Sequence, residues 1–200
     1  MTGLADRVIS DAAKAVLAPL GLSRKGRSRT WIDDHGWWLV NVEFQPSSHA
    51  KGCYLNVGTQ HLWVARGYFC FDDMERPLGG TTFVAFTGDE DAFARAMRKV
   101  VAAAAEAVVG RRRRHGEGRD ALAALAAGSD DLDAGIAATL LGEASRARAR
   151  FNGRIHAADQ TWADEYSALD ADAARSRASE VIAEERTALG LRPARTPSAW

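Results

Sequence analysis

The sequence predicts an α+β protein, with an antiparallel meander of three to four strands backed by helices and a C-terminal helical extension. Residues 1–88 combine an amphipathic helical pattern with alternating, strand-like segments, whereas residues 89–200 are rich in Ala and poor in β-branched residues. We therefore expect an α+β domain over residues 1–110, a helical extension packed on it over 111–189, and a disordered tail over 190–200.

The composition is that of a folded protein without a dominant charge. Apolar residues make up 46% and charged residues 26% of the chain, and 26 Lys and Arg balance 26 Asp and Glu. This balance does not favour bulk nucleic acid as a partner. The longest apolar run, residues 100–109, is shorter than the roughly 20 residues that cross a bilayer. With two cysteines and no secretory-signal pattern, we expect a cytoplasmic protein, and its Ala- and Arg-rich composition is associated with bacterial genomes.

The first part of the chain begins with a helix over residues 4–18, which Pro19 ends. Apolar residues share one face of this helix, namely Leu4, Val8, Ala12, Ala15 and Val16. A polar connector at residues 23–28, a short strand at 29–33 and a tight turn at Gly36 come next.

Two longer strands are predicted at residues 37–45 and 52–64, because their apolar residues alternate. The face turned to the core carries Trp38, Val40, Val42 and Phe44 on the first strand, and Cys53, Leu55, Val57 and Thr59 on the second. Pairing of Val42 with Leu55 would place Asn41 opposite Asn56 on the other, polar face.

The rest of the chain reads as one further strand followed by helices. A strand at residues 81–86 precedes a capping-box pattern from Thr87 to Glu90. The helix that follows carries a buried stripe and ends at Gly110; the stripe consists of Phe93, Met97, Val100, Val101, Ala104 and Val108. Short helices are expected at 120–127 and 130–141. Two longer helices with apolar stripes are expected over 143–189, as an αα-hairpin.

Part of the chain resembles a bacterial family, domain of unknown function family 4304. The resemblance rests on APLGLSRKGRSRTW at 18–31, NVEFQPS at 41–47 and YLNVG at 54–58. The family pattern is a helix that ends in a Leu-Gly-Phe type turn, then a basic glycine-containing segment, then strands. This chain departs from it at Leu22, where an aromatic residue is more usual, and at Pro46. The resemblance is loose over residues 1–110; it implies an α+β fold and supplies no activity or catalytic residue.

Catalytic and metal-binding motifs are weak in this sequence. Cys53 alternates with apolar residues, which favours a buried structural thiol over a nucleophile. None of the five histidines has a zinc-site spacing, so we expect no metal and no cofactor. The run Arg111–Arg114 follows the expected helix end, where cations are favourable; without interleaved aromatic residues it does not indicate nucleic-acid binding.

The polar face of the predicted sheet is the candidate binding surface. It carries aromatic and amide side chains of the kind found at interfaces, namely Trp37, Asn41, Glu43, Gln45, Tyr54, Asn56 and Gln60. An ordinary solvated face, or one covered by the C-terminal helices, is the competing interpretation. The hypothesis is a non-enzymatic binding or protein-interaction module, of which an immunity-type or regulatory protein is one form. The alternative is an enzyme with a small-molecule site built around Glu43 and neighbouring amides. The sequence leaves the oligomeric state open.

Overall fold

Six β-strands and seven α-helices make up the described residues (3–79, 83–116, 118–128, 131–153 and 155–193) of a computed structural model. The protein is therefore of the α+β class, as predicted. The chain divides into two units. The first comprises Met1–Gln60 and Phe69–Arg111, and the second comprises His61–Tyr68 and Arg112–Trp200.

The sheet of the first unit has more strands than the three or four expected. Its strand order is β1 (Ser23–Arg24), β2 (Thr30–Asp34), β3 (Trp38–Gln45), β4 (Gly52–His61) and β5 (Asp73–Glu75), and β6 (Val84–Ala85) also pairs with β4. The two longest strands match the predicted ones closely. The additional strands β1 and β5 have only two or three residues, too few to show alternation in the sequence. The strand predicted at 81–86 is represented by β6, and residues 81–82 lie outside the described residues.

The turn between β2 and β3 forms as the sequence predicts. The Asp34 carboxylate accepts a hydrogen bond from the Gly36 amide at 3.0 Å, and Gly36 has a φ of 87°, which favours glycine. His35 stacks on Trp38 with 4.0 Å between ring centroids. Trp37 belongs to this turn and not to β3, so the alternation of the strand does not determine where its ring points.

Helix α1 (Leu4–Leu17) forms where expected, but its buried face lies one position further along the chain. The buried residues are Ala5, Ile9, Ala13 and Leu17, and Val16 is 36% exposed. Both sets of residues are apolar and have helical spacing, so periodicity alone does not separate them. The observed face buries the large side chains of Ile9 and Leu17 together.

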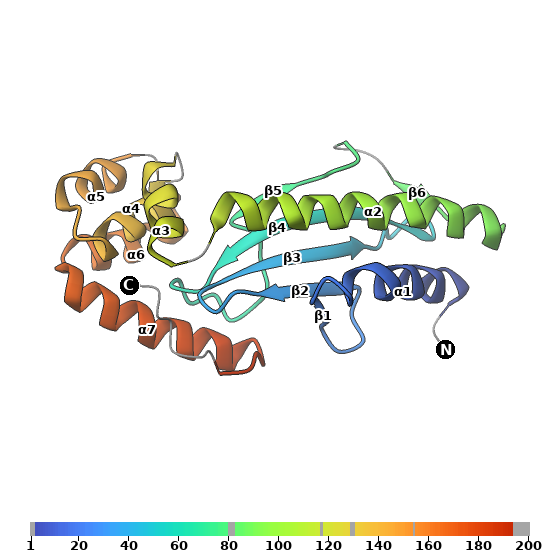
Figure 1. The fold of residues 1–200 in the computed structure, drawn as a ribbon, viewed down its shortest axis with the longest axis horizontal. Helices are drawn as coiled ribbons and strands as arrows, with labels where there is room; N and C mark the ends of the chain where they lie inside the picture. The colour runs from blue at the N-terminus through green and yellow to red at the C-terminus, as the bar shows by residue number, and fades with distance from the viewer. Residues whose placement is uncertain (1–2, 80–82, 117, 129–130, 154, 194–200) are drawn as a thin grey trace. The chain divides into compact units, whose positions relative to one another are not determined.

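Helix α2 (Glu90–His115) runs along the sheet (Figure 1) and buries the whole predicted stripe. The Met97 sulfur lies 3.8 Å from the Cys53 sulfur, which places α2 on the apolar face of β4. Asp89 accepts a hydrogen bond from the Ala92 amide at 2.9 Å, so the helix starts later than the Thr87 capping box predicts.

The predicted end of α2 at Gly110 is wrong, because the helix continues to His115. Gly110 does not adopt the positive φ with which glycine ends a helix. Arg111 is buried and donates to the Thr59 hydroxyl at 2.8 Å and to the Asp73 carboxylate at 2.7 Å. These bonds hold the helix on the sheet at Arg111. The arginine run therefore lies inside α2, and its first member is a structural residue of the first unit.

The second unit is organised around one buried helix. Its helices are α3 (Gly118–Ala127), α4 (Asp131–Leu140), α5 (Ala144–Phe151), α6 (Gln160–Ser167) and α7 (Ala171–Ala188), with a 3₁₀ turn at Ala157–Asp159. Helix α4 packs against the other four helices, as its nearly unbroken burial requires. The long helix predicted before residue 167 is in fact broken after Phe151, where Asn152 and Gly153 disfavour helix continuation. The expected αα-hairpin is replaced by helices grouped around α4.

The segment His61–Tyr68 belongs to this helical unit although its first residue, His61, is the last residue of β4. The Trp63 indole donates to Asp133 at 2.6 Å, and the Tyr166 hydroxyl donates to the Trp63 carbonyl at 3.2 Å. The buried Glu185 carboxylate accepts the backbone N–H groups of Arg66 and Gly67, at 3.0 and 2.9 Å. These bonds satisfy buried polar groups and attach the segment to α4, α6 and α7.

The first residues of the predicted disordered tail are attached to α7, because the Leu191 amide donates to the Arg186 carbonyl at 2.8 Å. Residues 194–200 lie outside the described part.

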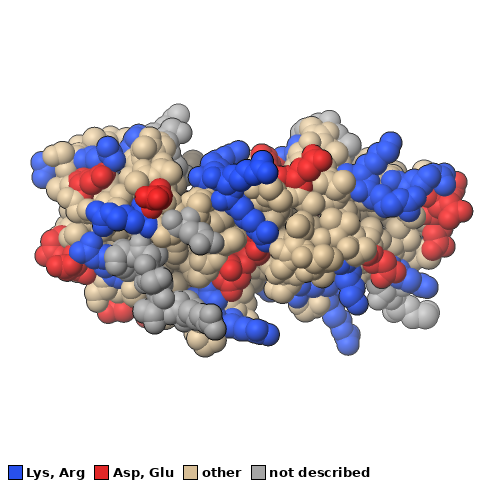
Figure 2. Space-filling model, in the orientation of Figure 1, with Lys and Arg blue, Asp and Glu red and all other residues tan. Residues whose placement is uncertain are grey.

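None of the described helices is long and apolar enough to span a membrane. Figure 2 shows Lys and Arg interspersed with Asp and Glu on the face drawn, in line with the formal net charge of zero.

Candidate functional site

The seven predicted binding residues differ in burial. Four of them are buried, namely Trp37, Asn41, Asn56 and Gln60. Glu43, Gln45 and Tyr54 are half-buried. The prediction that Trp37 lies on an open polar face of the sheet is wrong, because only 3% of this residue is exposed. A binding role for the seven residues stays a prediction.

The three half-buried residues lie around the side-chain amide of Asn56. Its nitrogen donates to Glu43 Oε2 at 3.1 Å and to Gln45 Oε1 at 2.9 Å. Its oxygen accepts from Arg76 Nε at 3.2 Å, and the Arg76 guanidinium lies 5.6 Å from the ring centroid of Tyr54. The side chains of Asn41 and Asn56, which the predicted register places opposite each other, share no hydrogen bond among the described residues, because Asn41 donates instead to Gln60 and to the Cys70 carbonyl.

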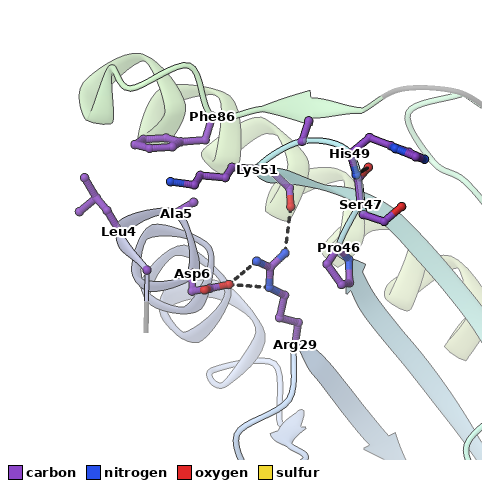
Figure 3. A pocket seen from close by; sticks show the side chains of 13 residues that line it. Leu4, Ala5, Asp6, Arg29, Pro46, Ser47, His49, Lys51 and Phe86 are labelled. Carbon is purple, nitrogen blue, oxygen red and sulfur yellow. Dashed lines mark hydrogen bonds and ion pairs between the residues drawn. The ribbon is translucent and has the colours of Figure 1, made fainter. Parts of the chain in front are cut away.

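A pocket of about 410 Å³ lies beside this unit's first helix, between α1 and the loop that joins β3 to β4. Figure 3 shows Arg29 in its wall, with its guanidinium bonded to the Asp6 carboxylate and to the Gly52 carbonyl, the latter at 2.9 Å. The Lys51 side chain extends across the pocket between Phe86 and the first turn of α1. Arg29 therefore fixes the geometry of the pocket, while Lys51 offers a positive charge inside it.

A second pocket, of about 580 Å³, adjoins the first and shares Asp6, Arg29 and Pro46 with it. Its walls include Arg24 from β1 and Arg27 from the loop between β1 and β2, together with Glu43. Arg24 is used in holding this loop, because it donates to the Ser10 hydroxyl at 2.7 Å and to the Ser28 carbonyl at 2.7 Å. We call the two adjoining pockets the Arg29 groove.

The Arg29 groove carries an excess of positive charge. Its walls include four cationic side chains, Arg24, Arg27, Arg29 and Lys51, against two carboxylates, Asp6 and Glu43. Hydroxyl groups are also part of the lining, from Ser10, Ser28, Thr30, Ser47 and Ser48. The side chains of Arg27 and Lys51 are exposed and have no hydrogen bond or ion pair to another described residue. The groove can therefore supply two uncommitted cations and several hydrogen-bond donors to an anionic ligand.

The sequence pattern predicts a polar connector at residues 23–28 and does not identify most of these cations as part of a site. A signal is present in the sequence, because four of the seven residues Ser23–Arg29 are basic. What the sequence does not show is that this segment folds beside the loop at residues 46–51. Of the seven predicted residues, Glu43 alone lines the groove.

Other candidate chemical groups have structural roles. Burial raises the pKa of the Cys53 thiol to about 11, so this cysteine is protonated near neutral pH and a poor nucleophile. In the helical unit, His61 Nδ1 lies 2.9 Å from Asp133 Oδ2 while the other oxygen of Asp133 accepts from Trp63. His61 and Asp133 are residue types that bind metals, and in this unit the two oxygens of Asp133 contact the His61 and Trp63 side chains.

Comparison with protein-family models found no match to the chain, and neither did comparison with curated proteins or with solved structures.

Proposed function

We propose that the first unit is a non-enzymatic binding module that takes an extended acidic peptide segment of a partner protein in the Arg29 groove. The observation that carries this proposal is the pair of adjoining pockets with four cations and two carboxylates on their walls. Two pockets that meet at Arg29 suit an extended ligand better than a compact one. The hypothesis of a binding module is kept, but the binding surface now proposed is this groove and not the polar sheet face.

The apolar part of the lining favours a peptide over a bare inorganic anion. The half-buried side chains of Leu4 and Phe86 contribute apolar surface to one pocket, and in the other Ile9 and Phe44 lie fully buried behind the lining. A segment that alternates acidic and apolar residues would place carboxylates near Arg27 and Lys51 and apolar side chains against this lining. Cations at the rim steer such a ligand and raise its association rate.

The test is a titration with a fluorescein-labelled octapeptide of alternating Asp and Leu, at about 50 and 200 mM salt, where screening of exposed charges differs. We expect saturable binding that weakens about tenfold in the variant Arg27→Ala/Lys51→Ala, which corresponds to about 1.4 kcal/mol. The matched control is Arg95→Ala/Lys99→Ala, which removes the same charge from exposed positions of α2 and should change the affinity less than twofold.

Equal weakening in both double variants would show nonspecific attraction and contradict the proposal. Competition by pyrophosphate at concentrations where a Leu-Ser octapeptide has no effect would instead indicate a phosphate-bearing ligand. The alternative of an enzyme built around Glu43 stays a prediction, as does membership in domain of unknown function family 4304.

A further inference from the structure

The part of the polar sheet face around Asn41 and Gln60 is covered by a short segment of the same unit, Phe69–Phe71. The Asn41 amide nitrogen donates to the Cys70 carbonyl at 2.8 Å. The Cys70 amide in turn donates to Gln60 Oε1 at 3.1 Å, and Asn41 also donates to that oxygen, at 3.2 Å. Two side-chain amides thus bind both the N–H and the C=O of one residue, as a neighbouring strand would do for an added peptide.

The aromatic residues on either side of Cys70 have their own binding places. An ideal Cβ at Gly58 would collide with the Phe71 ring and would lie 2.6 Å from the Asp73 carbonyl, so glycine is needed there both for the ring and for the pairing of β5 with β4. The Lys25 ammonium lies 3.7 Å from the centroid of the Phe69 ring, within the range of a cation–π interaction. Partial burial also lowers the pKa of Lys25. Each residue of this aromatic–X–aromatic tripeptide therefore makes its own contact with the first unit.

One hydrogen-bonding group of this face is left over. Asn41 is only 1% exposed, and its Oδ1 has no hydrogen-bond partner among the described residues. Buried acceptors are normally paired. A peptide that presented one further N–H to Asn41 would satisfy the face more completely than the chain's own segment does.

We propose that the amide face formed by Asn41 and Gln60 is a peptide-binding site, which Phe69–Phe71 occupies in cis and from which a partner segment of the same aromatic–X–aromatic pattern displaces it. The site shares no residue with the Arg29 groove, so a result that contradicts one proposal leaves the other unaffected.

Cys70 gives a direct measure of displacement. Cys70 is half-buried while the segment lies on the sheet face, whereas Cys53 is buried. We therefore expect Cys53 to react slowly. The probe is the peptide acetyl-Gly-Tyr-Phe-Ser-Phe-Asp-Asp-amide, which copies residues 67–73 with serine in place of Cys70. In the full-length wild-type chain, we expect this peptide to accelerate modification of Cys70 by a disulfide reagent at least threefold, with saturation in the millimolar range. That range is set by the high effective concentration of the tethered segment. The same peptide with both Phe residues replaced by Ser is the control and should have no effect.

A variant tests the site from the other side. In Phe69→Ser/Phe71→Ser the segment should open, so that Cys70 reacts at least tenfold faster and the labelled peptide binds at least tenfold more tightly than to the wild type. An open segment, shown by fast Cys70 modification, together with no peptide binding would overturn the proposal. Should the double variant not fold, the wild-type measurement decides alone: no acceleration, or equal acceleration by the serine control peptide, contradicts a specific site.

Discussion

Trp37 and Trp38 are neighbours in sequence and both are buried, although strand alternation predicts that they point in opposite directions. Trp37 lies in the β2–β3 turn, with 6.3 Å between its ring centroid and that of Trp38 at an interplanar angle of 58°. The structure therefore replaces the expectation of a surface tryptophan with that of a core residue.

We predict that Trp37→Ala lowers the free energy of unfolding by about 3–5 kcal/mol, as Trp38→Ala does, because both substitutions empty a packed site. The measurement is urea denaturation of each variant. The control is Met74→Ala on β5, where the side chain is 47% exposed and the cost should stay below about 1 kcal/mol. A Trp37→Ala variant as stable as the Met74→Ala variant would restore the exposed-anchor interpretation.

At the scale of elements, two glycines inside helices have opposite surroundings. A Cβ at Gly110 of α2 would meet no atom within 4 Å, whereas a Cβ at Gly135 of α4 would lie 2.4 Å from the Phe151 ring. Neither glycine has a positive φ. Gly135 thus permits α5 to approach α4 closely, and Gly110 has no such role.

The substitution Gly110→Ala should raise the free energy of unfolding by about 0.5–1 kcal/mol, because alanine favours the helix and the space is open. Gly135→Ala should lower it by about 1–3 kcal/mol, since the overpacking against Phe151 exceeds the gain in helix propensity. Thermal melts of the two variants check the opposite signs. Stabilisation of both would show that α5 yields to the added methyl group without cost.

At the scale of the whole molecule, the chain enters the helical unit twice, first with His61–Tyr68 and later from Arg112 onward. Leu62, Trp63 and Val64 in the first of these segments are fully buried. Within this segment, Trp63 bonds to Asp133 of α4 and Tyr166 of α6, and the Arg66 and Gly67 amides bond to Glu185 of α7. Removal of those helices leaves an apolar segment uncovered in the middle of the chain.

We therefore predict that a chain truncated after residue 128 does not melt cooperatively at the wild-type temperature and that it self-associates through the uncovered segment. Light scattering and thermal melts of the truncated and full-length chains check this. A monomeric truncation with an unchanged melting temperature would mean that the first unit does not depend on the helices.

The sequence by itself determined the α+β class, the two long strands and the buried stripe of α2, because these elements have strong local periodicity. It also indicated the turn at Gly36, where Asp and Gly have a local chemical preference. Local pattern did not reach the two-residue strand β1, the buried face of α1, the break after Phe151 or the continuation of α2 past Gly110. For α2, the bonds of Arg111 to distant residues decided where the helix ends, whereas the break after Phe151 has a local cause in Asn152 and Gly153, which the stripe of apolar residues across it outweighed in the prediction.

Only the tertiary structure decided where the candidate sites lie. The basic residues of 23–29 are visible in the sequence, but their place beside Lys51 depends on the pairing of β1 and β2 and on the position of α1. Likewise, the amides Asn41 and Gln60 alternate as a polar face should, yet the fold covers them with Phe69–Phe71. The physical reason is that alternation states which side of a strand a residue occupies, whereas burial depends on which other segment packs on that side.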